Sequence, residues 1–164
     1  MKKQLVTWRD VEHHVQEILR QMQRDSWMPD YVVGLTRGGL VPANMISQYL
    51  DVPMETLKVK LRDHADTESN SQIAHDAFIN KRILIVDDIN DTGATLNWIK
   101  KDWMKDEPET GRWNAVWGGN VRVATLYDNE SSKSELTVDY TAVTINKADE
   151  DVWIDFPWES WWTR

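Results

Sequence analysis

The sequence predicts a single α/β domain over residues 1–164, with a central, mostly parallel twisted sheet flanked by helices. Three observations predict this fold class. The 164 residues are about the size of one compact domain. Apolar, β-branched runs alternate with segments of helical periodicity, which is the order of βα units. One run, Ile83–Val86, is continuously apolar, as in a parallel strand covered on both faces.

The first part of the chain predicts a helix, a strand, a helix and a strand. Thr7 can cap a helix, and the carboxylate of Asp10 suits its first turn. Apolar residues then recur at helical spacing: Val11, Val15, Ile18, Leu19 and Met22. Strands are expected over Tyr31–Leu35 and Thr56–Leu61, with a helix over Leu40–Leu50 between them.

Two long polar segments interrupt the rest of the chain. Arg62–Asn80 is polar and predicts a flexible loop, whereas Asp106–Asn120 contains proline and several glycines and predicts an inserted loop or hairpin. The other expected elements are strand Ile83–Val86, loop Asp87–Gly93, helix Ala94–Lys105, and strands Val121–Tyr127 and Leu136–Ile145.

Composition and charge narrow the class of protein. The net charge of −8 argues against a protein that coats nucleic acid, so no nucleic-acid partner is expected. Cysteine is absent, which excludes a disulfide framework and Cys-ligated zinc and fits a reducing compartment, so we expect a cytoplasmic protein. The start of the chain lacks a long apolar stretch, and no apolar run is long enough to span a membrane.

The segment from Ile83 to Thr95 carries the clearest chemical signal. Asp87 and Asp88 follow a buried strand, where they can accept hydrogen bonds from vicinal sugar hydroxyls or hold magnesium. A small-residue turn then opens a helix, whose N-terminal N–H groups can bind a phosphate. The residues of this expected phosphate turn are Asp91, Thr92, Gly93, Ala94 and Thr95.

This segment resembles the substrate-binding motif of the type I phosphoribosyltransferases. The resemblance implies that the chain binds phosphoribosyl pyrophosphate with Mg²⁺, the turn holding the 5′-phosphate. It implies catalytic roles for Asp87 and Asp88, which would bind the ribose and the metal. Asp91 would contact the base near N7 and move a proton, although its position also suits a helix cap.

A second segment, Val33–Pro42, resembles the pyrophosphate loop of the same family. Arg37 follows a strand, and the two glycines after it free the backbone. The resemblance implies that Arg37 and Gly38 bind the pyrophosphate and that a cis peptide bond lies near Arg37. The other interpretation of Arg37 is an ordinary surface arginine.

A third segment, Val152–Glu159, resembles the tail of the bacterial xanthine-guanine branch of that family. The resemblance implies a small C-terminal hood and a base-binding tail over residues 146–164. The ring of Trp153 would cover the purine, and the backbone of Ile154 would read its edge. From sequence alone, Trp153 can equally be a core or interface residue. The family also implies a homodimer or homotetramer.

One position departs from the family pattern. The xanthine-guanine enzymes place a lysine after the strand that matches Val121–Tyr127, where it donates to the 6-oxo group of the purine. Here that base-binding position is Asp128, and an ionised carboxylate can only accept. Unless Asp128 points away, it would repel a 6-oxo group; Lys133 or Lys147 would then have to reach the base instead.

The expected function is purine salvage by transfer of a phosphoribosyl group to a guanine-, xanthine- or hypoxanthine-like base. The partners expected are therefore phosphoribosyl pyrophosphate and a purine base. Two alternatives stay open. One is a phosphoribosyltransferase for a different base, and the other is a non-catalytic regulator that senses nucleotides on the same fold.

Overall fold

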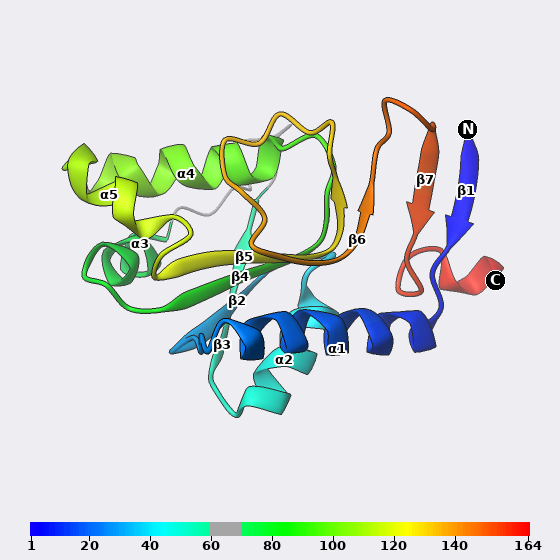
Figure 1. The fold of residues 1–164 in the computed structure, drawn as a ribbon, viewed down its shortest axis with the longest axis horizontal. Helices are drawn as coiled ribbons and strands as arrows, with labels where there is room; N and C mark the ends of the chain where they lie inside the picture. The colour runs from blue at the N-terminus through cyan, green and yellow to red at the C-terminus, as the bar shows by residue number, and fades with distance from the viewer. Residues whose placement is uncertain (60–69) are drawn as a thin grey trace.

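A computed structural model describes residues 1–59 and 70–164 of the chain. Its main sheet has the strand order β3-β2-β4-β5-β6, and every neighbouring pair is parallel (Figure 1). The strands are β2 (Tyr31–Thr36), β3 (Met54–Lys58), β4 (Ile83–Asn90), β5 (Val121–Asn129) and β6 (Tyr140–Ile145). The predicted fold class is confirmed.

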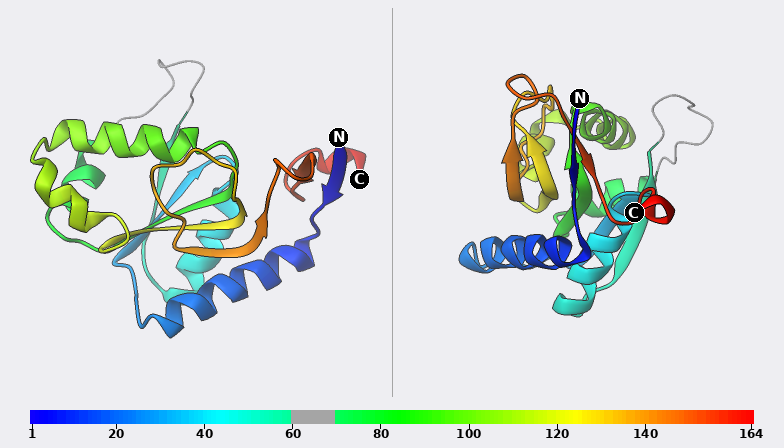
Figure 2. Two further views of the ribbon diagram at one scale, coloured as in Figure 1. Left: turned by 45° about the horizontal axis from the view of Figure 1, so that its top comes forward. Right: turned by 90° about the vertical axis from the view of Figure 1, so that its right-hand side faces the viewer.

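Helices cover both faces of this sheet (Figures 1 and 2). One core cluster joins the sheet to the first two helices, and a second joins it to the other three. The helices are α1 (Trp8–Arg24), α2 (Leu40–Leu50), α3 (Ser71–Phe78), α4 (Ala94–Asp106) and α5 (Thr110–Val116). In the described part of the chain, no helix is long and apolar enough to span a bilayer.

The central strand β4 explains how one sheet supports two cores. Leu84 and Val86 pack in the cluster with α1 and α2, whereas Ile83 and Ile85 pack in the cluster on the opposite face. All four side chains are fully buried. Because successive side chains of a strand point to opposite faces, the continuous apolar run fills both cores at once.

A small second sheet forms the hood that was expected from the tail. Strand β1 (Lys2–Leu5) pairs in parallel with β7 (Val152–Asp155), so the two ends of the chain lie together. A short 3-10 helix, η2 (Trp161–Thr163), follows. The guanidinium of Arg164 donates to the carbonyl oxygens of Val6 and Asp155, at 3.0 and 2.7 Å, and ties the tail to the start of α1.

The loop predicted over Arg62–Asn80 is corrected where the structure describes it. Residues 60–69 lie outside the described part, but Ser71–Phe78 forms helix α3. Asn70 caps this helix, since its Oδ1 atom accepts from the backbone N–H of Ile73 at 3.1 Å. The helix forms because its few apolar residues share one face and are buried in the second core: Ile73, Ala74 and Ala77.

The insertion predicted as a loop or hairpin, Asp106–Asn120, is also corrected. It contains helix α5, which ends at Val116. Trp113 is fully buried, and its ring stacks on that of Trp117 with 5.6 Å between the ring centroids. The Trp113 ring also packs against Phe78 of α3, with 6.0 Å between the ring centroids. This tertiary contact stabilises a helix that the proline and glycines of the segment did not indicate.

Several strand boundaries differ from the prediction. Strand β4 continues through Asp87 and Asp88 to Asn90, so the loop predicted over Asp87–Gly93 is shorter. The cause is pairing with β5, which extends to the partners Asn90 and Asp128. In addition, β3 begins at Met54 rather than Thr56, and β6 begins at Tyr140 rather than Leu136.

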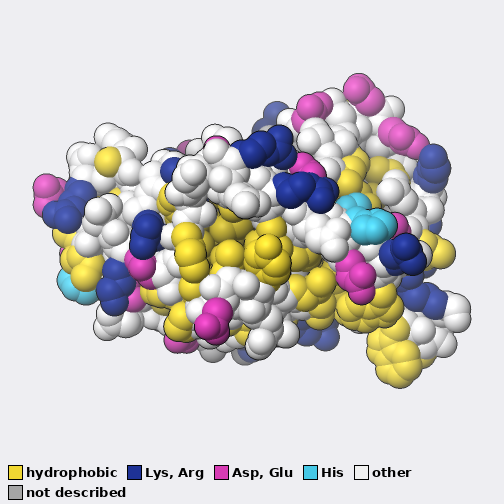
Figure 3. Space-filling model, turned by 60° about the horizontal axis from the view of Figure 1, so that its bottom comes forward, with side chains coloured by type: hydrophobic (Ala, Val, Ile, Leu, Met, Phe, Trp, Pro, Cys, Tyr) yellow, Lys and Arg dark blue, Asp and Glu magenta, His cyan; other side chains and the backbone are white. Residues whose placement is uncertain are grey.

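Apolar side chains also gather on one outer face of the molecule (Figure 3). A groove of about 650 Å³ lies there between α1, the segment after it and the end of α2. Its apolar lining comes from Leu19, Met22, Trp27, Met28, Tyr49 and Leu50. These segments lead into the amino ends of β2 and β3, so the groove is remote from the carboxyl ends where ligands of such sheets bind.

Candidate active site

The sequence-predicted site residues come mainly from two connections at the carboxyl edge of the main sheet. One connection runs from β2 to α2 and contains Arg37, and the other runs from β4 to α4. These strands are neighbours and parallel, so both connections leave the sheet at the same edge. Strand β4 itself supplies Asp87 and Asp88, and the hood and the end of β5 supply the remaining predicted residues.

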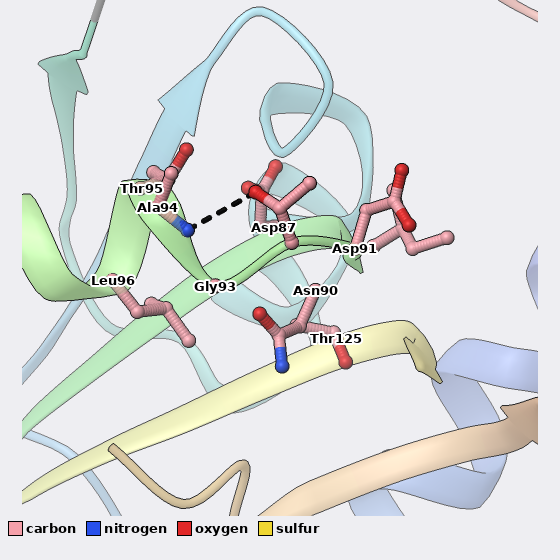
Figure 4. A pocket seen from close by; sticks show the side chains of 10 residues that line it. Asp87, Asn90, Asp91, Gly93, Ala94, Thr95, Leu96 and Thr125 are labelled. Atoms are coloured by element: carbon pink, nitrogen blue, oxygen red, sulfur yellow. Dashed lines mark hydrogen bonds between the residues drawn. The ribbon is translucent and has the colours of Figure 1, made fainter. Parts of the chain in front are cut away.

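The phosphate turn surrounds a small pocket of about 80 Å³ at the N-terminus of α4 (Figure 4). The pocket is lined by Asp87, Ile89, Asn90, Asp91, Thr92, Gly93, Ala94, Thr95, Leu96 and Thr125. The backbone N–H of Ala94 donates to the Thr92 hydroxyl at 3.2 Å. The first N–H groups of a helix have no partner within the helix, so this end can receive an anion.

Gly93 is required in this turn for two reasons. Its φ angle is +92°, a left-handed conformation that favours glycine. A Cβ atom at Gly93 would also overlap the backbone nitrogen of Ser134 and lie 2.7 Å from the carbonyl carbon of Lys133. The segment after β5 is bonded here, because the N–H of Lys133 donates to the Thr92 carbonyl oxygen at 2.8 Å. Gly93 thus allows the segment after β5 to pack closely against the turn.

The carboxylates of Asp87 and Asp88 lie side by side at the end of β4. Each accepts a hydrogen bond from the next backbone N–H, Asp87 Oδ1 at 2.9 Å and Asp88 Oδ1 at 2.7 Å. Burial raises the pKa of Asp87 well above its ordinary range, and the negative charge of Asp88 raises it further. Burial also raises the pKa of Asp88. A cation or a set of hydroxyl donors would relieve this repulsion.

The pair fits a magnesium ion better than a fully caged metal. Within residues 1–59 and 70–164, no group of three or more His, Asp or Glu side chains is arranged to hold a metal. Magnesium usually keeps several waters and binds through one or two carboxylates together with substrate phosphates. Asp87 and Asp88 are of that type, whereas a structural zinc or calcium site would need more protein ligands.

The β2–α2 connection lies directly against this pair. The peptide bond between Thr36 and Arg37 is cis, as the resemblance suggested. Arg37 is exposed, and Gly38 lies so close to Asp88 that a Cβ atom would overlap the carboxylate. The expected pyrophosphate loop and the expected metal and ribose site therefore form one continuous surface.

A ring of the hood and a cation of the connection between β6 and β7 lie near Asp91, the first residue of the phosphate turn. Trp153 is 47% exposed, whereas Ile154 beside it is buried. The Nζ atom of Lys147 lies 5.7 Å from the centroid of the Trp153 ring. The same Nζ atom lies 3.0 Å from Oδ2 of Asp91. The predicted stacking ring and the predicted proton-transfer group are thus close together in space.

Asp128 has its own partner in the structure. Its Oδ1 atom accepts from the side-chain amide of Asn90 at 2.9 Å, and the same amide donates to the Ser132 hydroxyl at 2.9 Å. Asn90 is buried, so these bonds satisfy a polar group that would otherwise be costly to bury. Contact of Asp128 with a base stays a prediction.

Two residues that the sequence interpretation did not single out belong to the same region. The amide of buried Asn129 donates to the Asp91 carbonyl oxygen at 2.9 Å, and its Oδ1 atom accepts from the N–H of Lys147 at 3.0 Å. Burial raises the pKa of Glu159, and the charge of Asp88 adds to this. Glu159 lies inside the tail segment that resembles the xanthine-guanine branch, so this resemblance could have pointed to it. No sequence pattern pointed to Asn129.

Known proteins resemble this chain over nearly its whole length. The phosphoribosyl transferase domain family matches residues 1–161. The xanthine-guanine phosphoribosyltransferase of Cereibacter sphaeroides is 32% identical over 133 residues, which cover 78% of this chain and 68% of that protein. The enzyme of the same name from Idiomarina loihiensis is 25% identical over 158 residues, or 94% of this chain and 85% of that protein.

A solved structure agrees with the sequence comparison. The crystal structure of a purine phosphoribosyltransferase from Pyrococcus horikoshii superimposes with a TM-score of 0.67 at 25% identity, covering 98% of this chain and 96% of that one. The phosphate turn, the acidic pair and the glycine loop are therefore set in the same overall fold. The chain belongs to the phosphoribosyl transferase family, as a relative of the xanthine-guanine phosphoribosyltransferases.

Proposed function

We propose that the chain transfers the 5-phosphoribosyl group of phosphoribosyl pyrophosphate to a 6-oxopurine such as guanine, xanthine or hypoxanthine. The bond from ribose C1 to the pyrophosphate oxygen breaks, and a bond from C1 to a ring nitrogen forms, with loss of the nitrogen's proton. The observation that carries the proposal is the contact between Gly38 and Asp88, which places the glycine loop against the acidic pair.

Phosphoribosyl pyrophosphate would lie across both connections. Its 5′-phosphate would occupy the pocket at the N-terminus of α4, where the Thr92 and Thr95 hydroxyls can add hydrogen bonds to the backbone N–H groups. Its pyrophosphate would reach the loop of Arg37 and Gly38, where the exposed guanidinium offers paired donors. The small size of the phosphate pocket supports this division, since the rest of the substrate must lie outside it.

The acidic pair would bind the ribose. Asp87 and Asp88 can accept hydrogen bonds from the vicinal hydroxyls, and together with substrate oxygens they can hold magnesium. Bound magnesium would supply positive charge to the leaving pyrophosphate. As that group departs, the ribose gains cationic character, and the two carboxylates supply a negative potential beside it.

Asp91 would handle the proton of the base. Its carboxylate belongs to the first residue of the phosphate turn, is 39% exposed and lies 3.0 Å from the Lys147 ammonium. A purine lying on the exposed ring of Trp153 would place its edge toward this carboxylate. Asp91 then accepts a proton as the base attacks, which is general-base catalysis.

The direct test is a pyrophosphate-release assay with phosphoribosyl pyrophosphate, magnesium and a panel of guanine, xanthine, hypoxanthine, adenine and uracil. We expect release with at least one 6-oxopurine and its loss in Asp88→Asn, which keeps the shape but removes the charge. Asp51→Asn is the matched control, because Asp51 is exposed at the C-terminal cap of α2. Binding of nucleotides without turnover on any base would instead favour the non-catalytic regulator.

A further inference from the structure

Lys147 lies in the connection between β6 and β7, far from the phosphate turn in sequence but next to it in space. Its Nζ atom donates to Asp91 Oδ2 at 3.0 Å and lies over the Trp153 ring, 5.7 Å from the centroid. Only 20% of its side-chain surface is exposed. A partly buried ammonium therefore stands between the proposed proton acceptor and the proposed stacking ring.

The side-chain amide of Asn129 holds the backbone of Lys147 beside that of Asp91. The N–H of Lys147 donates to Asn129 Oδ1 at 3.0 Å, and the amide of the same Asn129 donates to the Asp91 carbonyl oxygen at 2.9 Å. Asn129 is 5% exposed, so these two bonds are sheltered from water. One buried amide thus fixes Lys147 and Asp91 relative to each other.

The other polar groups near the end of β5 do not supply this positive charge. Asp128 carries a carboxylate, and its Oδ1 atom is bonded to Asn90. Lys133 is exposed, and its contact with the phosphate turn is made by its backbone N–H, which donates to the Thr92 carbonyl oxygen. Among the lysines of the described segment from Asp128 to Asp155, Lys147 is the one whose ammonium contacts both Asp91 and Trp153.

The chemistry of a 6-oxopurine matches this pair of charges. In that base, ring atom N7 and the oxygen at position 6 are neighbours on one edge. A purine that stacks on Trp153 with N7 toward Asp91 brings its 6-position toward the ammonium of Lys147. An ammonium has three donors and no acceptor, so it favours an oxygen there and disfavours an amino group.

We propose that Lys147 is the specificity-determining residue for the base, donating to the oxygen at position 6 of the purine from the β6–β7 connection. This inference rests on the proposed function and names the group that selects the substrate. With three donors, the ammonium can keep its bond to Asp91 and add one to the base. The positive charge that is missing at Asp128, at the end of β5, is then supplied by Lys147 from the connection between β6 and β7.

The test combines a change in the residue with a change in the substrate. The value of kcat/KM is measured for the wild type and for Lys147→Met with two bases, guanine and 2-aminopurine. The second base lacks the 6-oxo group. Where 2-aminopurine turns over too slowly, its competitive inhibition constant is measured instead of kcat/KM. Loss of the Lys147–Asp91 ion pair affects both bases equally, whereas loss of the contact to oxygen affects guanine alone. We expect an additional loss of about 10- to 100-fold for guanine.

Three further variants sharpen the outcome. Lys147→Arg keeps the charge and the donors and should recover part of the preference for guanine. Lys101→Met, at an exposed position of α4, is the control and should leave both values unchanged. Lys133→Met tests the other lysine that could reach the base. If Lys133→Met loses activity specifically with guanine and Lys147→Met does not, the assignment is overturned.

The results separate this inference from the proposed function. If none of the bases tested supports pyrophosphate release by the wild type, the proposed function fails and the inference fails with it. If the wild type is active but Lys147→Met weakens guanine and 2-aminopurine equally, only the inference fails, and Lys147 acts by positioning Asp91. A larger loss for guanine, with an unchanged KM for phosphoribosyl pyrophosphate, supports it.

Discussion

The α-carbon of Gly38 faces the carboxylate of Asp88 so closely that a Cβ atom there would overlap Oδ2 and lie 2.8 Å from Oδ1. Gly38 lies in the connection between β2 and α2, whereas Asp88 lies in the last part of strand β4. Their contact fixes the distance between the loop proposed for pyrophosphate and the carboxylate proposed for ribose and magnesium. A substrate that spans both groups requires this spacing.

The first prediction follows from this contact. In Gly38→Ala, the added methyl group displaces the Asp88 carboxylate or the loop, so kcat/KM for phosphoribosyl pyrophosphate should fall by about 100-fold, as expected for a small misplacement of reacting groups. The thermal midpoint should change little, since the disturbance is confined to the site. Gly111→Ala is the matched control, because a Cβ at Gly111 meets nothing within 4 Å. Equal effects of both variants on kcat/KM would contradict the prediction.

The second prediction concerns the repulsion within the acidic pair. Burial and the neighbouring charge of Asp88 raise the pKa of Asp87, so at pH 7 its ionised form lowers the stability of the fold. Asp87→Asn keeps the acceptor for the Asp88 N–H but removes the charge. The free energy of unfolding should therefore rise, while activity falls. Urea unfolding at pH 7 without metal measures it, and a loss of stability would show that the charge is already compensated.

The third prediction distinguishes the two roles open to Asp128. Because its carboxylate accepts from the buried Asn90 amide, Asp128→Ala should lower the free energy of unfolding by about 1 kcal/mol. Asp128→Asn keeps an acceptor and should lose less. The ratio of kcat/KM for guanine to that for adenine should stay the same in both variants. A changed ratio would show that Asp128 faces the base, as the family pattern suggested.

The sequence predicted best those features whose physical causes are local. The periodicity of α1 and its Thr7 cap lie within a few residues, and so do the acidic pair and the turn that follows it. Each of these needs only the pattern of neighbouring side chains. Helix α4 was found for the same reason, because its phosphate turn marks its start.

The features that were missed depend on contacts between distant parts of the chain. Strand β1 forms because it pairs with β7 at the other end of the chain, and four polar and apolar residues alone do not indicate a strand. Helix α5 is held by Trp113, whose ring packs against Phe78 of α3 with 6.0 Å between the ring centroids. The ion pair of Lys147 with Asp91 joins residues 56 positions apart, so sequence could name Lys147 only as one of two candidates.

The last prediction concerns the helix that carries the first core cluster. At its start, the Asp10 N–H donates to the Thr7 hydroxyl at 3.0 Å, and the Thr7 N–H donates to Asp10 Oδ2 at 2.9 Å. Thr7→Ala should therefore lower the free energy of unfolding by about 1 kcal/mol. The hydrogen bond from the Thr7 backbone lowers the pKa of Asp10, so its stabilising effect is present at pH 7 and is lost as the pH falls through the folded-state value below 3.8.

Asp10→Asn checks this sign. It should be less stable than the wild type at pH 7, and the difference should shrink toward zero as the pH falls below about 4, because protonation removes the same charge from the wild type. Urea unfolding of both proteins across this range gives the comparison. Arg9→Gln, at an exposed position one residue earlier, is the control and should show no such convergence. A difference that is constant with pH would mean that the bond from Thr7 does not depend on the charge of Asp10.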